Sequence, residues 1–103
     1  MNENTRKCKL IGFSKFAEKE TGVMKLRVVV GIESISENYK GIMVVPAVFL
    51  DYTEQLSELL NKALNNECNI EYVTRENIIT GKTKIVQLKI ENQNANILDS
   101  EEK

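Results

Sequence analysis

The sequence predicts a mainly β domain in which one helix lies between the third and fourth of five strands. An apolar run, Ile42–Leu50, leads directly into the one segment with a helical repeat, Asp51–Asn66. Two segments before that run and two after it alternate apolar and polar residues, with the period of two that is typical of strands. The expected order of elements is therefore β-β-β-α-β-β.

The predicted helix begins at Asp51 and ends at Asn65-Asn66. We expect Asp51 to be the N-cap, because its carboxylate can accept a hydrogen bond from a free backbone N–H of the first turn, and Glu54 would complete a capping box. Apolar residues recur three and four positions apart and so share one face of the helix. A helix of this length is marginal alone in water, so this face must pack on the sheet. The apolar positions are Tyr52, Leu56, Leu59, Leu60, Ala63 and Leu64.

The first predicted strand covers residues 6–16. Simple alternation places Leu10 on one face and Phe13 on the opposite face, together with the lysines of this strand. Gly12, in the middle, indicates a bend or a bulge. A polar turn that ends at Gly22 then leads into the second strand.

The second predicted strand, Met24–Glu33, has the clearest period-two alternation of the chain, and one of its faces should lie on the core. The third, Tyr39–Leu50, contains Pro46. Because proline lacks a backbone N–H, this strand must bend, lie at an edge or form two short pieces. After the helix we expect a fourth strand at Glu67–Arg75 and a fifth at Lys84–Glu91, joined by a glycine-containing loop.

Composition predicts one domain, residues 1–91, and a tail, residues 92–103, that we expect to be disordered because it is rich in Asn, Asp, Glu and Ser. The chain has no apolar run long enough to span a membrane, and its N-terminus lacks the apolar core of a signal peptide. We therefore expect a cytoplasmic protein. Histidine is absent, no pair of acidic residues stands out, and the two cysteines lack metal-ligand spacing. These observations predict a protein that is not an enzyme and binds no metal or other cofactor.

Five short strands with one helix between the third and fourth is the layout of the OB fold. On the order of its elements, on Gly12 in the first strand and on the position of the helix, the chain resembles the OB-fold single-stranded DNA-binding proteins of phages and conjugative elements. The resemblance covers residues 6–91. It implies a five-stranded barrel that binds single strands, DNA rather than RNA, without reading sequence and in a salt-dependent way. It also leaves open a homodimer and a protein partner for the acidic tail.

Binding of this kind needs cations along the phosphates and flat side chains against the bases. Phe13 is a candidate stacking platform, with the alternative that a twist at Gly12 turns its ring inward. The other aromatic residues with a favoured position, Phe16, Phe49, Tyr52 and Tyr72, are expected in the core. The candidate nucleic-acid-binding residues are Lys7, Lys9, Phe13, Lys15, Lys25, Arg27, Tyr39, Lys40, Arg75, Lys82 and Lys84.

Two alternatives remain open. A β-grasp or another α+β roll would fit if the first strand or the run around Pro46 were a loop. For function, a protein-interaction adaptor or inhibitor subunit on a small β scaffold is favoured by the net charge, which is −3 over residues 91–103 and only +2 over residues 1–90. A carboxylate-based enzyme is a third hypothesis, which the absence of histidine disfavours.

Overall fold

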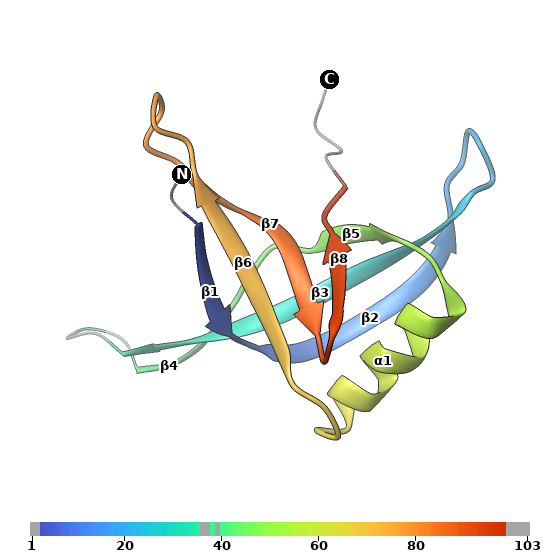
Figure 1. The fold of residues 1–103 in the computed structure, drawn as a ribbon, viewed down its shortest axis with the longest axis horizontal. Coiled ribbons are helices and arrows are strands. Elements are labelled where there is room, and N and C mark those ends of the chain that lie inside the picture. Colours follow the sequence, from blue (N-terminus) through green and yellow to red (C-terminus); the bar gives the residue numbers. More distant parts are fainter. Residues whose placement is uncertain (1–2, 36–37, 39, 99–103) are drawn as a thin grey trace.

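The computed structural model describes residues 3–35, 38 and 40–98 of the chain, which form eight strands and one helix (Figure 1). The protein is mainly β with one helix, as the sequence predicts. The strands are β1 (Glu3–Lys7), β2 (Lys9–Ala17), β3 (Met24–Ile35), β4 (Lys40–Val44), β5 (Val48–Asp51), β6 (Ile70–Glu76), β7 (Thr83–Ile90) and β8 (Gln93–Asn96). The helix α1 (Glu54–Leu64) lies between β5 and β6.

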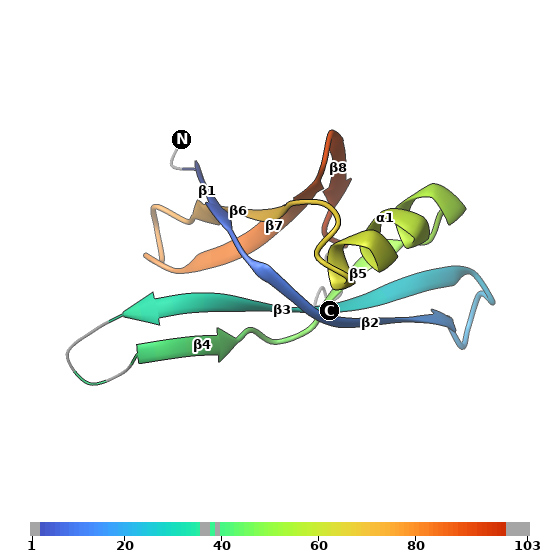
Figure 2. The ribbon, with the colours of Figure 1, turned by 90° about the horizontal axis from the view of Figure 1, so that it is seen from below.

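The strands form two antiparallel sheets that face each other across the core (Figure 2). Sheet A has the order β1-β6-β7-β8, and sheet B has the order β2-β3-β4, with β5 also paired to β3. Only Cys8 separates β1 from β2, so the chain passes from one sheet to the other at that residue. No closed barrel is detected in the described part of the chain.

The predicted third strand forms two short pieces, which was one of the three outcomes expected from Pro46. β4 and β5 both pair with β3, and Pro46 lies between them. The predicted first strand also forms two pieces, β1 and β2, which belong to different sheets. A single strand was therefore the wrong prediction at this position.

The core lies between the inner faces of the two sheets and is closed at one end by α1. β3 shows the predicted alternation: Leu26, Val28 and Val30 are at most 1% exposed. Leu88 and Ile90 face them from sheet A and are fully buried. The helix contributes its own apolar face, on which the buried residues are Leu56, Leu60 and Ala63.

A β-bulge at Ile11 changes the alternation of β2. Leu10 pairs with Val30, but Gly12 pairs with Val29, so Ile11 is an extra residue in this strand. An extra residue shifts every later side chain to the other face of the sheet. Phe13 is therefore opposite the buried Val28 and packs against the core, which is the stated alternative in which its ring turns inward; of the lysines in this strand, only Lys15 shares its side of the sheet.

The helix begins two residues later than predicted. Thr53 is the N-cap, and its Oγ1 accepts a hydrogen bond from the Leu56 N–H at 3.0 Å. Asp51, the predicted cap, is instead the last residue of β5 and is paired with Lys25 of β3. The helix ends as predicted, with Asn66 at a φ of 61°. With eleven residues, α1 is too short to cross a membrane, and the described residues contain no other helix.

We expected disorder from residue 92 onward, but residues 93–98 form a strand and backbone hydrogen bonds. β8 pairs with β7, and Ala95 is buried. The Ile97 N–H donates to the Val86 carbonyl at 3.0 Å, and the Leu98 N–H donates to the Phe49 carbonyl at 2.8 Å. This last bond links the chain beyond sheet A to β5 of sheet B. Residues 99–103 lie outside the described residues.

Candidate nucleic-acid interface

The outer face of sheet B carries two aromatic rings and two cations. Residues paired directly across an antiparallel sheet point to the same side. Arg27 is paired with Phe49, and Lys25 is paired with Phe16. Because the intervening Leu26 faces the core, these four side chains lie on the opposite, outer face, which we call the sheet B face.

The rings of Phe16 and Phe49 contact each other on this face. Their centroids are 5.9 Å apart and their planes meet at 78°, an edge-to-face arrangement that aromatic pairs prefer. Both rings are only half-buried. Arg27 is exposed and has no ion pair within the described residues. A free guanidinium therefore lies beside two partly exposed rings.

The second cation of the sheet B face is already neutralised. The Lys25 Nζ lies 3.7 Å from Glu18 Oε1 and 3.9 Å from Asp51 Oδ1, and its side chain is only 22% exposed. The carboxylate of Glu18 is held in turn by a hydrogen bond from Thr21 Oγ1 at 2.8 Å. Lys25 therefore fixes the base of the β2–β3 hairpin more than it offers a free charge.

Beyond the rings, the sheet B face continues as an apolar surface. Gly31 has no side chain, and Ile11 and Ile42 come together above it. Ile11 and Ile42 are each 44% exposed, and Val44, at the end of β4, is 62% exposed. The face thus changes from aromatic and cationic near the β2–β3 hairpin to aliphatic near β4.

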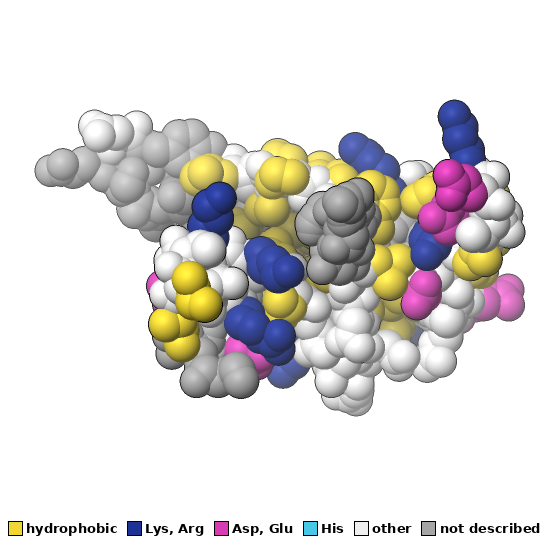
Figure 3. Space-filling model, turned by 90° about the horizontal axis from the view of Figure 1, so that it is seen from above, with side chains coloured by type: hydrophobic (Ala, Val, Ile, Leu, Met, Phe, Trp, Pro, Cys, Tyr) yellow, Lys and Arg dark blue, Asp and Glu magenta, His cyan; other side chains and the backbone are white. Residues whose placement is uncertain are grey.

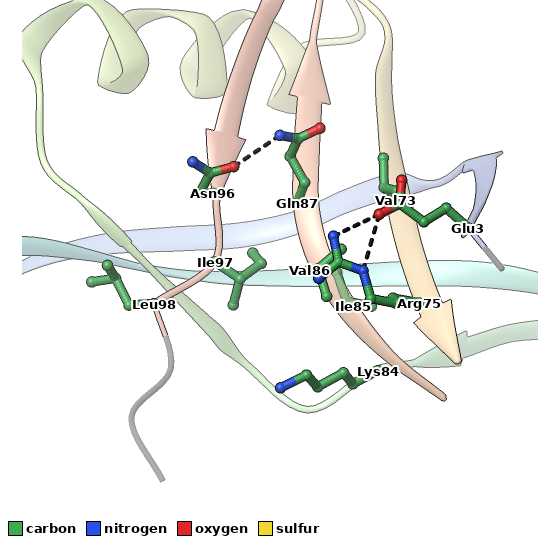
Figure 4. Close-up of a pocket in the computed structure, with 10 residues that line it drawn as sticks. All are labelled: Glu3, Val73, Arg75, Lys84, Ile85, Val86, Gln87, Asn96, Ile97 and Leu98. Atoms are coloured by element: carbon green, nitrogen blue, oxygen red, sulfur yellow. Dashed lines mark hydrogen bonds and ion pairs between the residues drawn. The ribbon is translucent and has the colours of Figure 1, made fainter. Parts of the chain in front are cut away.

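A pocket of about 490 Å³ lies at sheet A, which we call the β7 pocket (Figure 4). On one side Arg75 donates two hydrogen bonds to Glu3 Oε2, at 3.0 and 2.6 Å. On another side the Gln87 amide donates to Asn96 Oδ1 at 2.8 Å. Lys84 has no ion pair within the described residues. The apolar lining consists of Val73, Ile85, Val86, Ile97 and Leu98.

The β7 pocket lies beside the β6–β7 hairpin, and the β6–β7 and β2–β3 hairpins both extend upward in Figure 1, at opposite ends of the molecule. Seen from that side, Lys and Arg side chains gather next to hydrophobic side chains (Figure 3). A second cavity at the base of the hairpin is lined in part by Arg75, Lys82 and Lys84, which makes these three cations neighbours.

The eleven predicted binding residues do not share one face. Phe13 is half-buried against the core, and Lys15 lies over the ring of Tyr52, with its Nζ 4.9 Å from the ring centroid. Tyr39 lies outside the described residues. The others divide between two surfaces. Lys9, Lys25 and Arg27 are on the outer side of sheet B and Lys40 is at the start of β4, whereas Lys7, Arg75, Lys82 and Lys84 belong to sheet A and its hairpin.

Phe16 and Phe49 are the residues that the sequence analysis missed, since both were expected in the core. For Phe49 the alternation in β5 is a usable signal. Neighbouring residues of a strand point to opposite faces, and Leu50, next to Phe49, is fully buried. No comparable signal exists for Phe16, whose side is decided by the bulge at Ile11.

The described residues contain no group of three or more acidic or cysteine side chains that could hold a metal ion. Both cysteines are free. Burial raises the pKa of the Cys8 thiol to about 12, and the nearby charge of Glu71 adds to this increase. The pKa of Cys68 is also raised, first by burial and then by the charge of Glu91. Neither thiol is activated as a nucleophile.

Comparison with models of protein families, with curated proteins and with solved structures found no match to this chain. The interpretation of its surfaces therefore depends on their own geometry and chemistry.

Proposed function

We propose that this protein binds single-stranded nucleic acid, DNA rather than RNA, through the sheet B face. The observation that carries the proposal is the pair of half-buried rings, Phe16 and Phe49, beside the exposed Arg27. Proteins that hold single strands without reading sequence stack bases on aromatic rings and place cations along the phosphates. An exposed sheet face that presents both features together fits this requirement.

The pairing of the strands supports an OB-like interpretation of the fold. If β1 and β2 count as one strand and β4 and β5 as another, the helix follows the third of five strands. The first strand then pairs with both the second and the fourth, and the fourth pairs with the fifth. We propose an OB-like fold in which the closing contact between the third and fifth strands is replaced by the segment that follows β8. The hydrogen bond from Leu98 to Phe49 is the contact that supports this replacement.

The free cations on the side of sheet A suit a second group of phosphates. Lys84 borders the β7 pocket, and Lys82 lies in the adjoining hairpin turn. Ammonium groups that neutralise phosphates release counterions, so binding should weaken steeply as salt increases.

The test is fluorescence anisotropy with a labelled oligo-dT strand at low and at high salt. The proposal is supported if the protein binds at low salt and the logarithm of its binding constant falls linearly with the logarithm of the salt concentration. No binding at low salt, or binding that salt does not change, overturns it. A matched oligo-U strand distinguishes DNA from RNA, because its 2′-hydroxyl groups are the main chemical difference at the contact.

A second candidate function is a protein-interaction module, and β4 favours it. β4 is the edge strand of sheet B, and its residues Ile42, Met43 and Val44 are 44%, 53% and 62% exposed. An exposed apolar edge strand can pair with an extended segment of another protein. A pull-down from the native host discriminates between the two functions: a stoichiometric protein partner that survives nuclease treatment favours the interaction module.

A further inference from the structure

The two residues that follow β8 connect the surfaces of the two sheets. The Ile97 N–H donates to the Val86 carbonyl of β7 at 3.0 Å, and the Leu98 N–H donates to the Phe49 carbonyl of β5 at 2.8 Å. β5 is paired in turn with β3. Backbone hydrogen bonds therefore join β7, residues 97–98, β5 and β3 side by side, so that the β7 pocket and the rings of the sheet B face are neighbours.

The candidate contact groups of both surfaces lie along this connection. Phe49 and Arg27 are paired between β5 and β3 and lie on the sheet B face. Leu98 and Lys84 both line the β7 pocket. Figure 4 shows Leu98 on one side of the pocket and the Lys84 side chain extended toward that side. These four residues thus follow one another across the strands, and we call them the cross-strand track.

The cross-strand track has two cations, neither of which has an ion pair within the described residues. The acidic side chains beside it are already engaged. Glu3, which lines the β7 pocket, accepts two hydrogen bonds from Arg75, and Asp51 of β5 lies 3.9 Å from Lys25 Nζ. A ligand along the track would therefore meet positive charge at both ends and apolar side chains between them. This order of groups complements a single strand, which has a charged backbone and flat bases.

The spacing of the two cations sets the length of strand that can reach both. Neighbouring strands of a sheet lie about 4.8 Å apart, so the three steps from β3 over β5 and residues 97–98 to β7 cover roughly 14 Å. This span corresponds to about four nucleotides at the rise of about 3.4 Å per nucleotide of a DNA helix. A dinucleotide without terminal phosphates has a single phosphodiester group, so it cannot contact both cations.

We propose that one single strand crosses both surfaces, with a base against the Phe49 ring and with phosphates at Arg27 and Lys84. Leu98 is the contact over which the strand passes from the sheet B face into the β7 pocket. The inference rests on the proposed binding of single strands and defines the ligand more narrowly, as a strand of at least about four nucleotides. The sheet B face and the β7 pocket are then two parts of one site.

The experiment is an NMR titration of the protein with two ligands. One is a thymidine dinucleotide without terminal phosphates, and the other is an oligo-dT of about eight nucleotides, twice the estimated span. The dinucleotide should shift the backbone signals around Phe49, whereas the longer strand should also shift those of Leu98 and Lys84. Because the longer strand joins both contacts in one molecule, it should bind at least about tenfold more tightly, with one strand for each protein molecule.

Variants of the track distinguish the two ligands further. Leu98→Glu places a carboxylate in the middle of the track, so it should remove the roughly tenfold advantage of the longer strand and leave the affinity for the dinucleotide unchanged. Leu64→Glu is the matched control, because Leu64 is a 41% exposed leucine at the end of α1, and it should change neither affinity. Lys84→Gln keeps the test independent of the folding of Leu98→Glu. It should weaken binding of the longer strand about twofold and leave the dinucleotide unaffected.

The outcomes separate the track from the proposed function. Two long strands bound to each protein molecule would mean two independent sites, which overturns the track but not the binding of single strands. Shifts that stay around Phe49 with the longer strand also overturn the track, as do equal losses for both ligands in Leu98→Glu and in Lys84→Gln. Failure of the parent protein to bind either ligand at low salt overturns the proposed function, and the track with it.

Discussion

The outer faces of the two sheets differ in what they can bind, although both are built on alternating strands. The sheet B face presents two rings and an unpaired guanidinium, Arg27. The corresponding side of sheet A presents an amide pair, Gln87 and Asn96, and an arginine already bound to Glu3. Rings can stack on bases of any sequence. Amides form only directional hydrogen bonds, and the charge of a paired ion is already neutralised by its partner. The position of the aromatic residues, more than the number of cations, therefore distinguishes the candidate interface.

The largest expected effect is on the ring of Phe49, which contacts Phe16 on the sheet B face. Phe49→Ala should weaken binding of oligo-dT by about 1–3 kcal/mol, because one base loses its stacking partner. Phe13→Leu is the control, since Phe13 packs against the core on the inner side of the same sheet. It should lower the unfolding temperature and leave the affinity unchanged. Anisotropy and thermal unfolding of the same samples give both quantities.

If Phe13→Leu lost as much affinity as Phe49→Ala, the outer face of sheet B would not be distinguished from its inner face. The two residues would then act through the stability of the sheet, and the distinction between its inner and outer faces would carry no functional meaning.

The second effect separates a free arginine from a paired one. Arg27→Gln should weaken binding by roughly 1 kcal/mol and reduce the salt slope by about 0.7, because one phosphate contact with a single strand is lost. Arg75→Gln should change the affinity less, since its guanidinium is already bound to Glu3. Its main effect should be on unfolding, and an exposed ion pair of this kind stabilises by about 0.2–1 kcal/mol. Salt titrations of both variants measure the two slopes, and a larger slope change in Arg75→Gln would reverse the ranking of the two faces.

The fold could be predicted from the sequence wherever the alternation is uninterrupted. β3 has no bulge, and Leu26, Val28 and Val30 are buried as expected. The apolar repeat of α1 was sufficient to predict that Leu56, Leu60 and Ala63 are buried, although Leu64, placed on the same face, is 41% exposed. Pro46 left three outcomes open, of which the structure shows the split between β4 and β5. In each case the signal is local, so one segment of sequence contains it.

The part of the candidate interface that lies on β2 could not be predicted because it depends on a bulge. The bulge at Ile11 turns Phe13 inward and Phe16 outward. A second irregularity places Gln87 opposite Val73 and Ile85 opposite Thr74, so that Ile85 packs against the core. A bulge is decided by how one strand fits its neighbour, and the sequence of a single strand does not contain that information.

For the helix cap, Asp51 and Thr53 are both good capping residues, and the pairing of Asp51 in β5 decides between them.

A smaller effect concerns the lysines of β7, which lie on the outer side of sheet A. Lys84 borders the β7 pocket, whereas Lys89 lies further along the same strand, paired with Glu71. Lys84→Gln should weaken binding of oligo-dT about twofold and lower the salt slope by roughly 0.7, the value for one phosphate of a single strand. Lys89→Gln, a change of the same type outside the pocket, should leave the slope unaltered. Equal slopes for the two variants would show that the β7 pocket takes no phosphate.

The last effect is on stability and not on affinity, and it tests the point at which the two sheets are joined. Cys8 lies between β1 and β2, and its thiol donates to the Ile70 carbonyl across 3.8 Å. Because burial raises the pKa of Cys8 to about 12 from 9.0, the folded state keeps its proton where the unfolded state loses it. The contribution of this thiol to stability is therefore complete below pH 9 and is lost as the pH rises toward 12. The free energy of unfolding should fall over this range more steeply in the parent protein than in Cys8→Ala. Since the lysines titrate in both proteins, only the difference between the two curves reports Cys8, and parallel curves would mean that no buried thiol links the sheets.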